Sequence, residues 1–427
     1  MLSYGQVRIA LLQLYYSHLP IYNLSFDMNV EGSLDYPLFE KCLNFMLQRH
    51  ESLRLNIRIE NDQVVPFLTG EKIKLNHDLD EKTFINTPFK LDQEVLIKVL
   101  VSGQRLVFLF SDLLIDGHTI LTYFKELGMI YNALWAKKMF TFPPLKPSIK
   151  VDHELHLPFW KDHLKKDMLL PLPVIQHTDD MTENRIKFLL SEKRIKSDIK
   201  ELNITLFDYF TGLFLLLLHF KSGSEQITID TLFTSHAEER IGLYNDVVLL
   251  PIDYTQYTGL TLGDYLKTYA GFLANVKARV VPLEYLCPRL DFHTLPNVRI
   301  HFEYSNKNTE KSLMFGDAKI GSNMYENSAS TIRQLLTFNV CEMEDGIECY
   351  FSFRKECFTK EQINGLIQDF KHLLVADQGQ SLAVLQEKSN VLTGSVFYQP
   401  TKDKRLTAYN FAGKYPDVKF SDFSRAL

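Results

Sequence analysis

The stretch FDYFTGLFLLLLHF, residues 207–220, limits the possible folds of this chain more than any other stretch. Apart from Asp208 near its start it is almost wholly apolar, so a helix formed here needs apolar neighbours on every side. It is also too short to cross a bilayer, which takes about 20 apolar residues. We therefore predict a helix buried in the centre of a large core.

Patterns typical of helices and strands alternate on both sides of this stretch. We expect helices over residues 4–16, 34–50 and 120–134. We expect strands over residues 22–32, 95–103, 105–110, 184–190 and 226–233. Strand patterns repeat every two residues and helical patterns about every 3.6. Alternation of the two along one chain predicts an α/β architecture.

The same patterns suggest how the chain is divided. Three prolines within residues 140–148 predict a surface connection, because proline ends regular structure. We expect an N-terminal half over residues 1–168 and a C-terminal half over residues 169–385. Residues 386–427 are polar and irregular, as expected of a linker.

Charge and cysteine content exclude several classes of protein. The 427 residues carry a net charge of −5, which argues against a nucleic-acid-binding protein or one that binds anionic membranes. Five cysteines without a C-x-x-C motif argue against a disulfide framework or a zinc ribbon, and they favour a reducing, cytoplasmic compartment. The N-terminus lacks the layout of a signal peptide.

Sequence motifs give no reason to expect a metal or a directly bound cofactor. Residues 152–156, DHELH, place His153 and His156 three apart, but the zincin pattern H-E-x-x-H is absent. Neither a glycine-rich phosphate loop nor a G-x-S-x-G motif occurs. We therefore expect no metal site and no cofactor held by the chain itself.

The candidate active site lies in FLFSDLLIDGHTI, residues 108–120. An apolar strand pattern ends at Ser111 and Asp112, and Asp116 and Gly117 precede a helical pattern. This layout resembles that of a known acyl-transfer active site, except that an aspartate stands where that site needs a histidine. Ser111, Asp112, Asp116 and Gly117 are the candidate site residues.

Several stretches, in order and over about 380 residues, make the chain similar to a known family. It resembles the condensation domains of nonribosomal peptide synthetases, in the chloramphenicol-acetyltransferase-like superfamily. The matching stretches are LSYGQVRIALLQL for S-x-A-Q-x-R-L-W, RHESLRL for R-H-E-x-L-R-T, SDLLIDG for H-H-x-x-x-D-G, IGLYNDVVLLP for I-G-x-F-V-N-T-x-x-x-R, and VPLEYL for the P-F-E segment.

The resemblance implies a fold and a set of partners. Two acetyltransferase-like lobes would form a V-shaped pseudo-dimer, with the loop of residues 111–117 at their junction and a central tunnel open on both faces. A donor and an acceptor carrier protein would dock on opposite faces, and their phosphopantetheine arms would bring the substrates. The segment LTAYNFAGKYPDVKF is similar to the linker that precedes an adenylation domain, and the start at Met1 suggests the first domain of a larger synthetase.

The chain departs from the family at the residues that carry the chemistry. The second histidine of H-H-x-x-x-D-G, placed to help an amine attack a thioester, is Asp112 here, and the first is Ser111. An unperturbed aspartate is a weaker base than histidine by about 2.6 pKa units, or roughly 3.5 kcal/mol. Burial raises the pKa of a carboxyl group and would offset part of this difference. Ser111 lacks a well-placed base, and His118 lies past Gly117 at the start of the helix.

The partner of Asp116 also differs from the family pattern. In the family this aspartate is mainly structural and is thought to pair with an arginine. Pro251 occupies the position of that arginine here, and Asp246 occupies the position of the family's asparagine. An aspartate immediately before a helix also serves as an N-cap, whatever else it contacts.

Four functions remain open from the sequence. We favour a degenerate condensation domain that has lost amide-bond formation and serves as a scaffold or docking platform for carrier proteins, because the missing base has no obvious replacement. The alternative is an active enzyme that performs condensation, acyl transfer or cyclization with Asp112 or by positioning alone. An acyltransferase that uses free acyl-CoA, and a heterocyclization domain, whose D-x-x-x-x-D motif needs one more residue than separates Asp112 from Asp116, are weaker fits.

Overall fold

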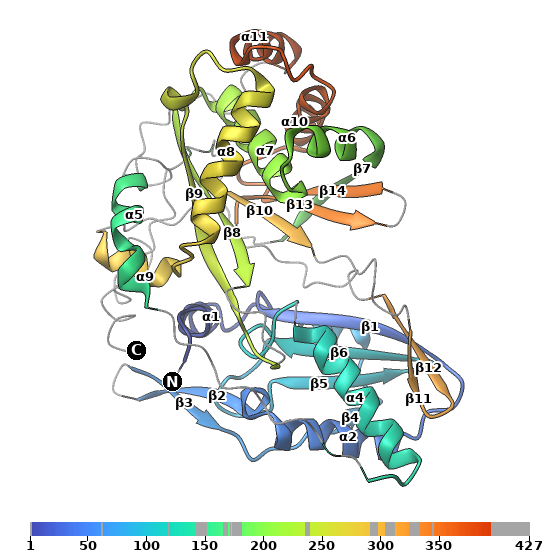
Figure 1. Ribbon diagram of the computed structural model, residues 1–427. Coiled ribbons are helices and arrows are strands. Elements are labelled where there is room, and N and C mark those ends of the chain that lie inside the picture. Colours follow the sequence, from blue (N-terminus) through green and yellow to red (C-terminus); the bar gives the residue numbers. More distant parts are fainter. Residues whose placement is uncertain are drawn as a thin grey trace.

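The computed structural model describes residues 2–60, 63–117, 119–139, 141, 152–164, 170, 172, 182–234, 240–290, 298–303, 312–323, 334–343 and 346–393. These residues form two lobes, each built on a six-stranded sheet (Figure 1). A separate hydrophobic core lies within each lobe. The mixed α/β architecture and the two lobes confirm the expected fold class, and the central tunnel stays a prediction.

The N-lobe sheet has the strand order β11-β12-β1-β6-β5-β4, and a small β2-β3 hairpin lies beside it. Phe108 of β6 packs edge-on against Phe39 of α2 and Phe124 of α4, so both helices cover the same face of this sheet. The elements of this part of the chain are α1 (Tyr4–Tyr15), β1 (Asn23–Glu31), α2 (Tyr36–Arg49), β2 (Leu55–Glu60), β3 (Gln63–Leu68), β4 (Leu75–Asn76), α3 (Glu81–Asn86), β5 (Ile97–Ser102), β6 (Arg105–Ser111) and α4 (Thr119–Trp135).

Two strands of the N-lobe sheet come from much later in the chain. β11 (Ser312–Phe315) pairs with β12 (Ala318–Asn323), and β12 pairs antiparallel with β1. Phe315 packs against Phe39 in the N-lobe core, and this buried contact holds the crossing segment in place. Residues 312–323 therefore lie in the N-lobe, although the sequence placed the whole of 169–385 in the second half.

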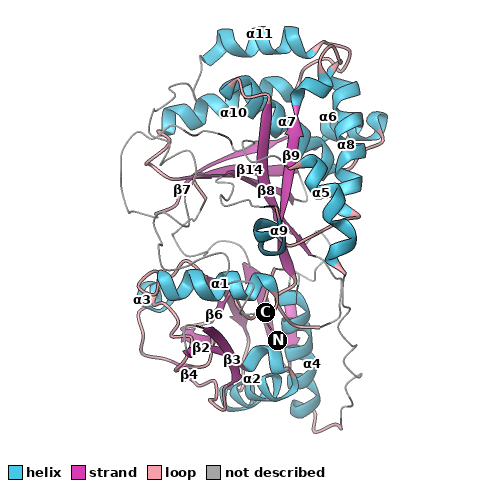
Figure 2. Cartoon of the chain, turned by 90° about the vertical axis from the view of Figure 1, so that its left-hand side faces the viewer, coloured by secondary structure: helices cyan, strands magenta, loops and turns pink. Residues whose placement is uncertain are grey.

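The C-lobe sheet has the strand order β7-β14-β13-β10-β8-β9. Figures 1 and 2 show its main helices gathered on one face, which leaves the other face directed towards the N-lobe. The elements are α5 (Leu157–His163), β7 (Asn184–Leu190), α6 (Glu192–Leu202), α7 (Leu206–Ser222), β8 (Gln226–Thr234), β9 (Asn245–Asp253), α8 (Leu262–Lys277), α9 (Leu283–Arg289), β10 (Val298–Glu303), β13 (Leu336–Met343), β14 (Gly346–Phe353), α10 (Lys360–Leu374) and α11 (Leu382–Thr393).

Helix α7 is the buried helix predicted from the apolar stretch. Every residue from Asp208 to Leu218 is buried. Thr205 and Asp208 form a capping box at its start, and Gly223, with φ of 67°, ends it in the left-handed conformation that glycine adopts without cost. The absence of a side chain at Gly212 lets α8 approach closely, since a Cβ there would lie 2.6 Å from Leu266 Cδ2.

The C-terminal end of the described chain is more regular than the sequence indicated. Helix α11 continues to Thr393, so the first eight residues of the expected linker, 386–393, are helical. The remaining part of that linker, residues 394–427, lies outside the described residues. Among the residues that are described, no single helix is long and apolar enough to cross a membrane; α6 and α7 together reach that length and composition, but they meet at 99°.

Candidate functional site

The loop between β6 and α4 holds the four candidate residues at the junction of the two lobes. Ser111 is the last residue of β6 and is fully buried. Its hydroxyl accepts a hydrogen bond from the Leu113 amide at 3.3 Å and donates one to Gln13 Oε1 at 3.4 Å. Because its contacts lie within the loop and the core, Ser111 shapes the loop and is badly placed to act as a nucleophile.

Asp116 caps the helix that follows the loop. One carboxylate oxygen accepts a hydrogen bond from the Thr119 amide at 2.9 Å. Asp116 is 2% exposed, so water does not replace this bond. This is the N-cap arrangement expected of an aspartate at the start of a helix.

The second oxygen of Asp116 bonds to the C-lobe. It accepts a hydrogen bond from the Tyr244 amide at 2.8 Å, and the Thr119 hydroxyl donates to the Gly242 carbonyl at 2.7 Å. Tyr244 immediately precedes β9, in the segment where the family carries its conserved asparagine and arginine. In this chain Pro251, inside β9, stands at the position of the family's arginine. The bond to Asp116 comes instead from the backbone amide of Tyr244.

Gly117 has no steric need to be glycine in this structure. It is exposed, and a Cβ built at this position would meet no atom within 4 Å. Residue 118, the histidine that follows Gly117 in the sequence, lies outside the described residues.

Asp112 is the candidate residue with the most unusual environment. Its amide donates to the Tyr22 carbonyl at 2.9 Å, which fixes the backbone beside β1. Asp112 is half-buried as a whole residue. Burial of its carboxyl group raises the pKa to about 6; the charges of Arg8 and Arg299 oppose this rise and that of Asp116 adds to it. A carboxyl group with a pKa of about 6 titrates close to the range of histidine.

The sequence analysis did not single out Arg8, which lies on α1 beside this loop. Its guanidinium Nη1 contacts Glu284 Oε1 of α9 at 2.8 Å, and both residues are buried. Burial lowers the pKa of Arg8, but the nearby charges, that of Glu284 first, outweigh it and raise the pKa above its usual value. Arg8 stands at the arginine of the S-x-A-Q-x-R-L-W motif, and Glu284 stands at the acid of the P-F-E segment. Because both residues match family motifs, the sequence alone could have marked them as candidate site residues.

The open face of the C-lobe sheet, opposite its helices, carries polar residues in register. Neighbouring strands place one row of polar side chains across five strands and a second row across four: Arg185, Ser352, Thr337, Arg299 and Asp230, then Lys187, Tyr350, Asn339 and His301. Most of these residues are buried, although side chains on the other face of the same strands form the apolar core. The rows therefore form a polar wall on the side of the C-lobe that is directed towards the N-lobe.

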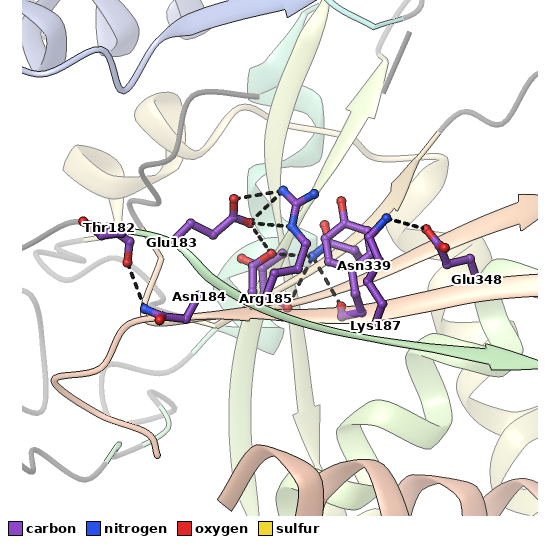
Figure 3. Close-up of polar contacts among 10 residues, drawn as sticks. Thr182, Glu183, Asn184, Arg185, Lys187, Asn339 and Glu348 are labelled. Carbon is purple, nitrogen blue, oxygen red and sulfur yellow. Dashed lines mark hydrogen bonds and ion pairs between the residues drawn. The ribbon is translucent and has the colours of Figure 1, made fainter. Parts of the chain in front are cut away.

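Each cation on this wall contacts a carboxylate. Figure 3 shows Arg185 held by Glu183 at 2.9 Å and Lys187 held by Glu348 at 3.2 Å. Arg299 makes a two-bond contact with the buried Asp230. This pairing balances the charge, so the wall offers hydrogen-bond donors and acceptors without the strong positive potential of a phosphate site.

His301 was also missed by the sequence analysis, although it alternates with Arg299 and apolar residues along β10. Burial first, and then the charge of Arg299, lower its pKa to about 4. His301 is therefore neutral near pH 7, and its pKa is lower than that of Asp112. As a proton acceptor it is the weaker of the two groups.

Residues able to hold a metal do not converge in the described part of the chain. There, no group of three or more histidine, cysteine, aspartate or glutamate side chains could hold a metal ion. His153 instead packs against Tyr4 and Tyr285, with ring centroids 6.0 and 5.1 Å apart. All five cysteines are described, buried and free of disulfides.

Comparison with known proteins decides which family these features belong to. The model of the condensation domain family matches residues 1–382. The chain belongs to this family. Gramicidin S synthase 2 of Aneurinibacillus migulanus is 24% identical over 409 residues, covering 83% of this chain and 9% of that protein. Tyrocidine synthase 3 of Brevibacillus parabrevis is 23% identical over 435 residues and covers 89% of this chain and 6% of that protein.

The chain therefore spans less than a tenth of the length of these synthetases. Solved structures agree on the fold. The X-domain from teicoplanin biosynthesis matches with a TM-score of 0.75 at 16% identity, over 90% of this chain and 96% of that one. The starter condensation domain of rhizomide synthetase matches with a TM-score of 0.70 at 15% identity, over 90% and 98%. The condensation fold, with its two lobes, is thus shown for this chain.

Proposed function

We propose that this condensation domain is part of a cytoplasmic nonribosomal peptide synthetase and transfers acyl groups with Asp112 in place of the family's histidine. The substrates would arrive as thioesters on the phosphopantetheine arms of a donor and an acceptor carrier protein. An adenylation domain would follow in the same synthetase. The family membership and the synthetase relatives support this setting.

The single observation that carries the catalytic part is the environment of Asp112. Sequence alone assigned an aspartate at this position a deficit of about 2.6 pKa units, or roughly 3.5 kcal/mol, relative to histidine. With the pKa of Asp112 at about 6, the difference from a free histidine falls to about half a unit, or roughly 0.7 kcal/mol. At pH 7 about nine in ten molecules would carry the ionised carboxylate.

In this proposal the carboxylate of Asp112 takes a proton from the attacking amine or orients it towards the thioester carbonyl. Asp116 keeps the loop in place through its bonds to Thr119 and Tyr244 and does not touch the substrate. Positioning two carrier-bound substrates at this junction supplies further rate, because it removes the entropy cost of bringing them together.

A docking domain without transfer activity is the second candidate. It is favoured by the likeness to the X-domain from teicoplanin biosynthesis, which has been solved in a complex with OxyB. The bonds of Asp116 would maintain the fold equally well in such a domain. In this case the surfaces that bind carrier proteins would be retained while Asp112 served no chemical purpose.

A single-turnover assay read by intact-protein mass spectrometry tests the proposal. An acceptor carrier loaded with an amino acid is mixed with acyl-carrier or acyl-CoA donors and with the wild-type chain or a variant. We expect transfer by wild type, its loss in Asp112→Asn and Asp112→Ala, and its retention in Asp112→His. Asp92→Asn, a change at an exposed turn, is the matched control.

The outcomes separate the two candidates. Transfer that survives in Asp112→Asn would refute a role for the carboxylate. If wild type transfers no acyl group from any donor but Asp112→His does, the site lacks only its base. If neither wild type nor any variant transfers an acyl group, while carrier proteins still bind in a pull-down, the chain acts as a docking domain.

A further inference from the structure

The segment of residues 241–244 lies between two strands of the C-lobe sheet, β8 and β9, yet its apolar side chains pack in the N-lobe core. Ile241 is 2% exposed and Leu243 is 8% exposed, and both belong to the apolar cluster of the N-lobe. Figure 1 shows β8 and β9 reaching from the C-lobe down to the N-lobe. A short piece of the C-lobe chain is therefore built into the N-lobe.

Ser52 of the N-lobe holds the first residue of this segment. It lies in the short 3-10 helix Glu51–Arg54, and its hydroxyl donates a hydrogen bond to the Ile241 carbonyl at 2.6 Å. Because Ile241 is buried, water cannot easily take the place of the hydroxyl. A buried carbonyl that loses its donor is destabilised, so this bond fixes the position of the segment.

The next residues of the segment are bonded to the candidate active-site loop and the start of α4. The Gly242 carbonyl accepts from the Thr119 hydroxyl at 2.7 Å, and the Tyr244 amide donates to Asp116 at 2.8 Å. Three backbone groups within four residues are thus held by the N-lobe, the first by Ser52 and the other two at the loop. The segment connects Ser52 to the loop.

The atoms along this connection are closely packed. A Cβ added to Gly242 would lie 3.0 Å from the Tyr244 ring, which folds back over the segment. Residues 113–115, which join Asp116 to Asp112, are fully buried in the N-lobe core. Groups packed this tightly transmit a displacement to their neighbours and do not absorb it.

We propose that Ser52 is a positioning residue for Asp112: through the segment 241–244 and Asp116, it keeps the active-site loop in place. Ser52 does not touch the reacting atoms. The consequence for catalysis rests on the proposed function of Asp112, whereas the effect of Ser52 on the loop does not. If Ser52 served only to join its own helix to the segment, its loss would be felt at Ile241 and no further.

Hydrogen exchange, resolved to single amides and measured on the full chain without substrate, tests the proposal. The Tyr244 and Asp112 amides report on two points along the connection, since each donates a hydrogen bond. In Ser52→Ala both amides should exchange roughly tenfold faster than in wild type, the factor that corresponds to about 1.4 kcal/mol for a lost buried hydrogen bond. Ser52→Thr keeps the hydroxyl and should exchange at the wild-type rate.

A matched control and a kinetic measurement complete the test. Thr268→Ala removes a hydroxyl-to-carbonyl bond of 2.7 Å within α8 and should leave the Tyr244 and Asp112 amides unchanged. In acyl transfer between loaded carriers, Ser52→Ala should lower kcat roughly tenfold with little change in KM, because a misplaced loop weakens transition-state contacts more than substrate binding. Ser52→Thr should restore kcat.

The two amides decide the outcome. Faster exchange of both in Ser52→Ala, with recovery in Ser52→Thr, supports the proposal. An unchanged Tyr244 or Asp112 amide overturns it, and so does equal acceleration throughout the protein, which would indicate a general loss of stability. If Ser52→Ala does not fold, Ser52→Cys, a weak donor of nearly the same size, carries the same test, and an unchanged Asp112 amide there overturns the proposal.

The kinetic result is interpreted separately from the exchange result. Faster exchange of the Asp112 amide with an unchanged kcat in Ser52→Ala would refute the catalytic consequence of positioning. A wild-type chain that transfers no acyl group would refute the proposed function of Asp112, and the exchange rates would still decide whether Ser52 positions the loop.

Discussion

Replacing Asp116 by alanine should remove two kinds of contact at once, a helix cap and a bond between the lobes. The cap is the bond from the Thr119 amide, and the lobe contact is the bond from the Tyr244 amide. Because Asp116 is 2% exposed, water cannot easily satisfy the donors that the alanine variant leaves behind. The loop should remain folded but lose its direct bond to the C-lobe.

The size of the effect follows from these contacts. Loss of an N-cap costs about 1 kcal/mol, and loss of a buried hydrogen bond to a charged group about 2 kcal/mol more. Asp116→Ala should therefore lower the free energy of unfolding by roughly 3 kcal/mol. Asp80→Ala is a close control, because Asp80 also caps a helix, with a bond from the Thr83 amide at 2.9 Å, and makes no such bond to the other lobe.

Urea unfolding of both variants, followed by tryptophan fluorescence and circular dichroism, measures the difference. Asp80→Ala loses only an exposed helix cap, so Asp116→Ala should be the more destabilised of the two, by roughly 2 kcal/mol. Equal losses in the two variants would show that the bond to Tyr244 adds nothing to stability. In that case Asp116 would be only a helix cap, and the idea that it joins the lobes would have to be abandoned.

Two further predictions concern pH and packing. Asp112 has a folded pKa of about 6, above its unfolded value near 3.9, so its ionisation lowers stability as the pH rises through this window, by at most about 3 kcal/mol. Asp112→Asn should therefore have a higher melting temperature than wild type at pH 8 and nearly the same melting temperature at pH 4. Equal changes in melting temperature at the two pH values would contradict the raised pKa. Gly212→Ala should destabilise the C-lobe by about 1–3 kcal/mol, because its Cβ would lie 2.6 Å from Leu266 Cδ2. Leu266→Ala in the same chain should recover part of that loss in thermal unfolding, and no recovery would place the clash elsewhere.

Hydrophobic patterning was sufficient to predict the fold class. The stretch around residues 207–220 predicted a buried helix because a helix that is apolar on all sides can exist only inside a core, and α7 confirms it. Thr359 likewise caps α10 from the residue just before it, through a bond from the Gln362 amide at 3.2 Å. These features are local, so a single segment of sequence contains them.

Long-range pairings were beyond the same reasoning. The strands within 312–323 join the N-lobe sheet through pairs such as Asn29 with Gly321, nearly three hundred residues apart. Local periodicity identifies a strand but does not identify its partner. The ion pair of Arg8 with Glu284 was missed for the same reason, since each residue alone looks like an ordinary charged residue in a helix.

In the loop of residues 111–117, the residues that hold the loop in place differ from the residue at the position of the catalytic histidine. The family's histidines can therefore be replaced without loss of the loop structure. The bonds that hold the loop run from Asp116 to backbone amides and from Gln6 to the Leu113 carbonyl, and none of them involves the side chain of Asp112. Exchange of histidine for aspartate at residue 112 therefore leaves the frame intact. The same frame would persist in an active enzyme and in a docking domain. The ionisation of Asp112, which burial opposes and neighbouring charges modify, is the property in which an active site and a scaffold should differ.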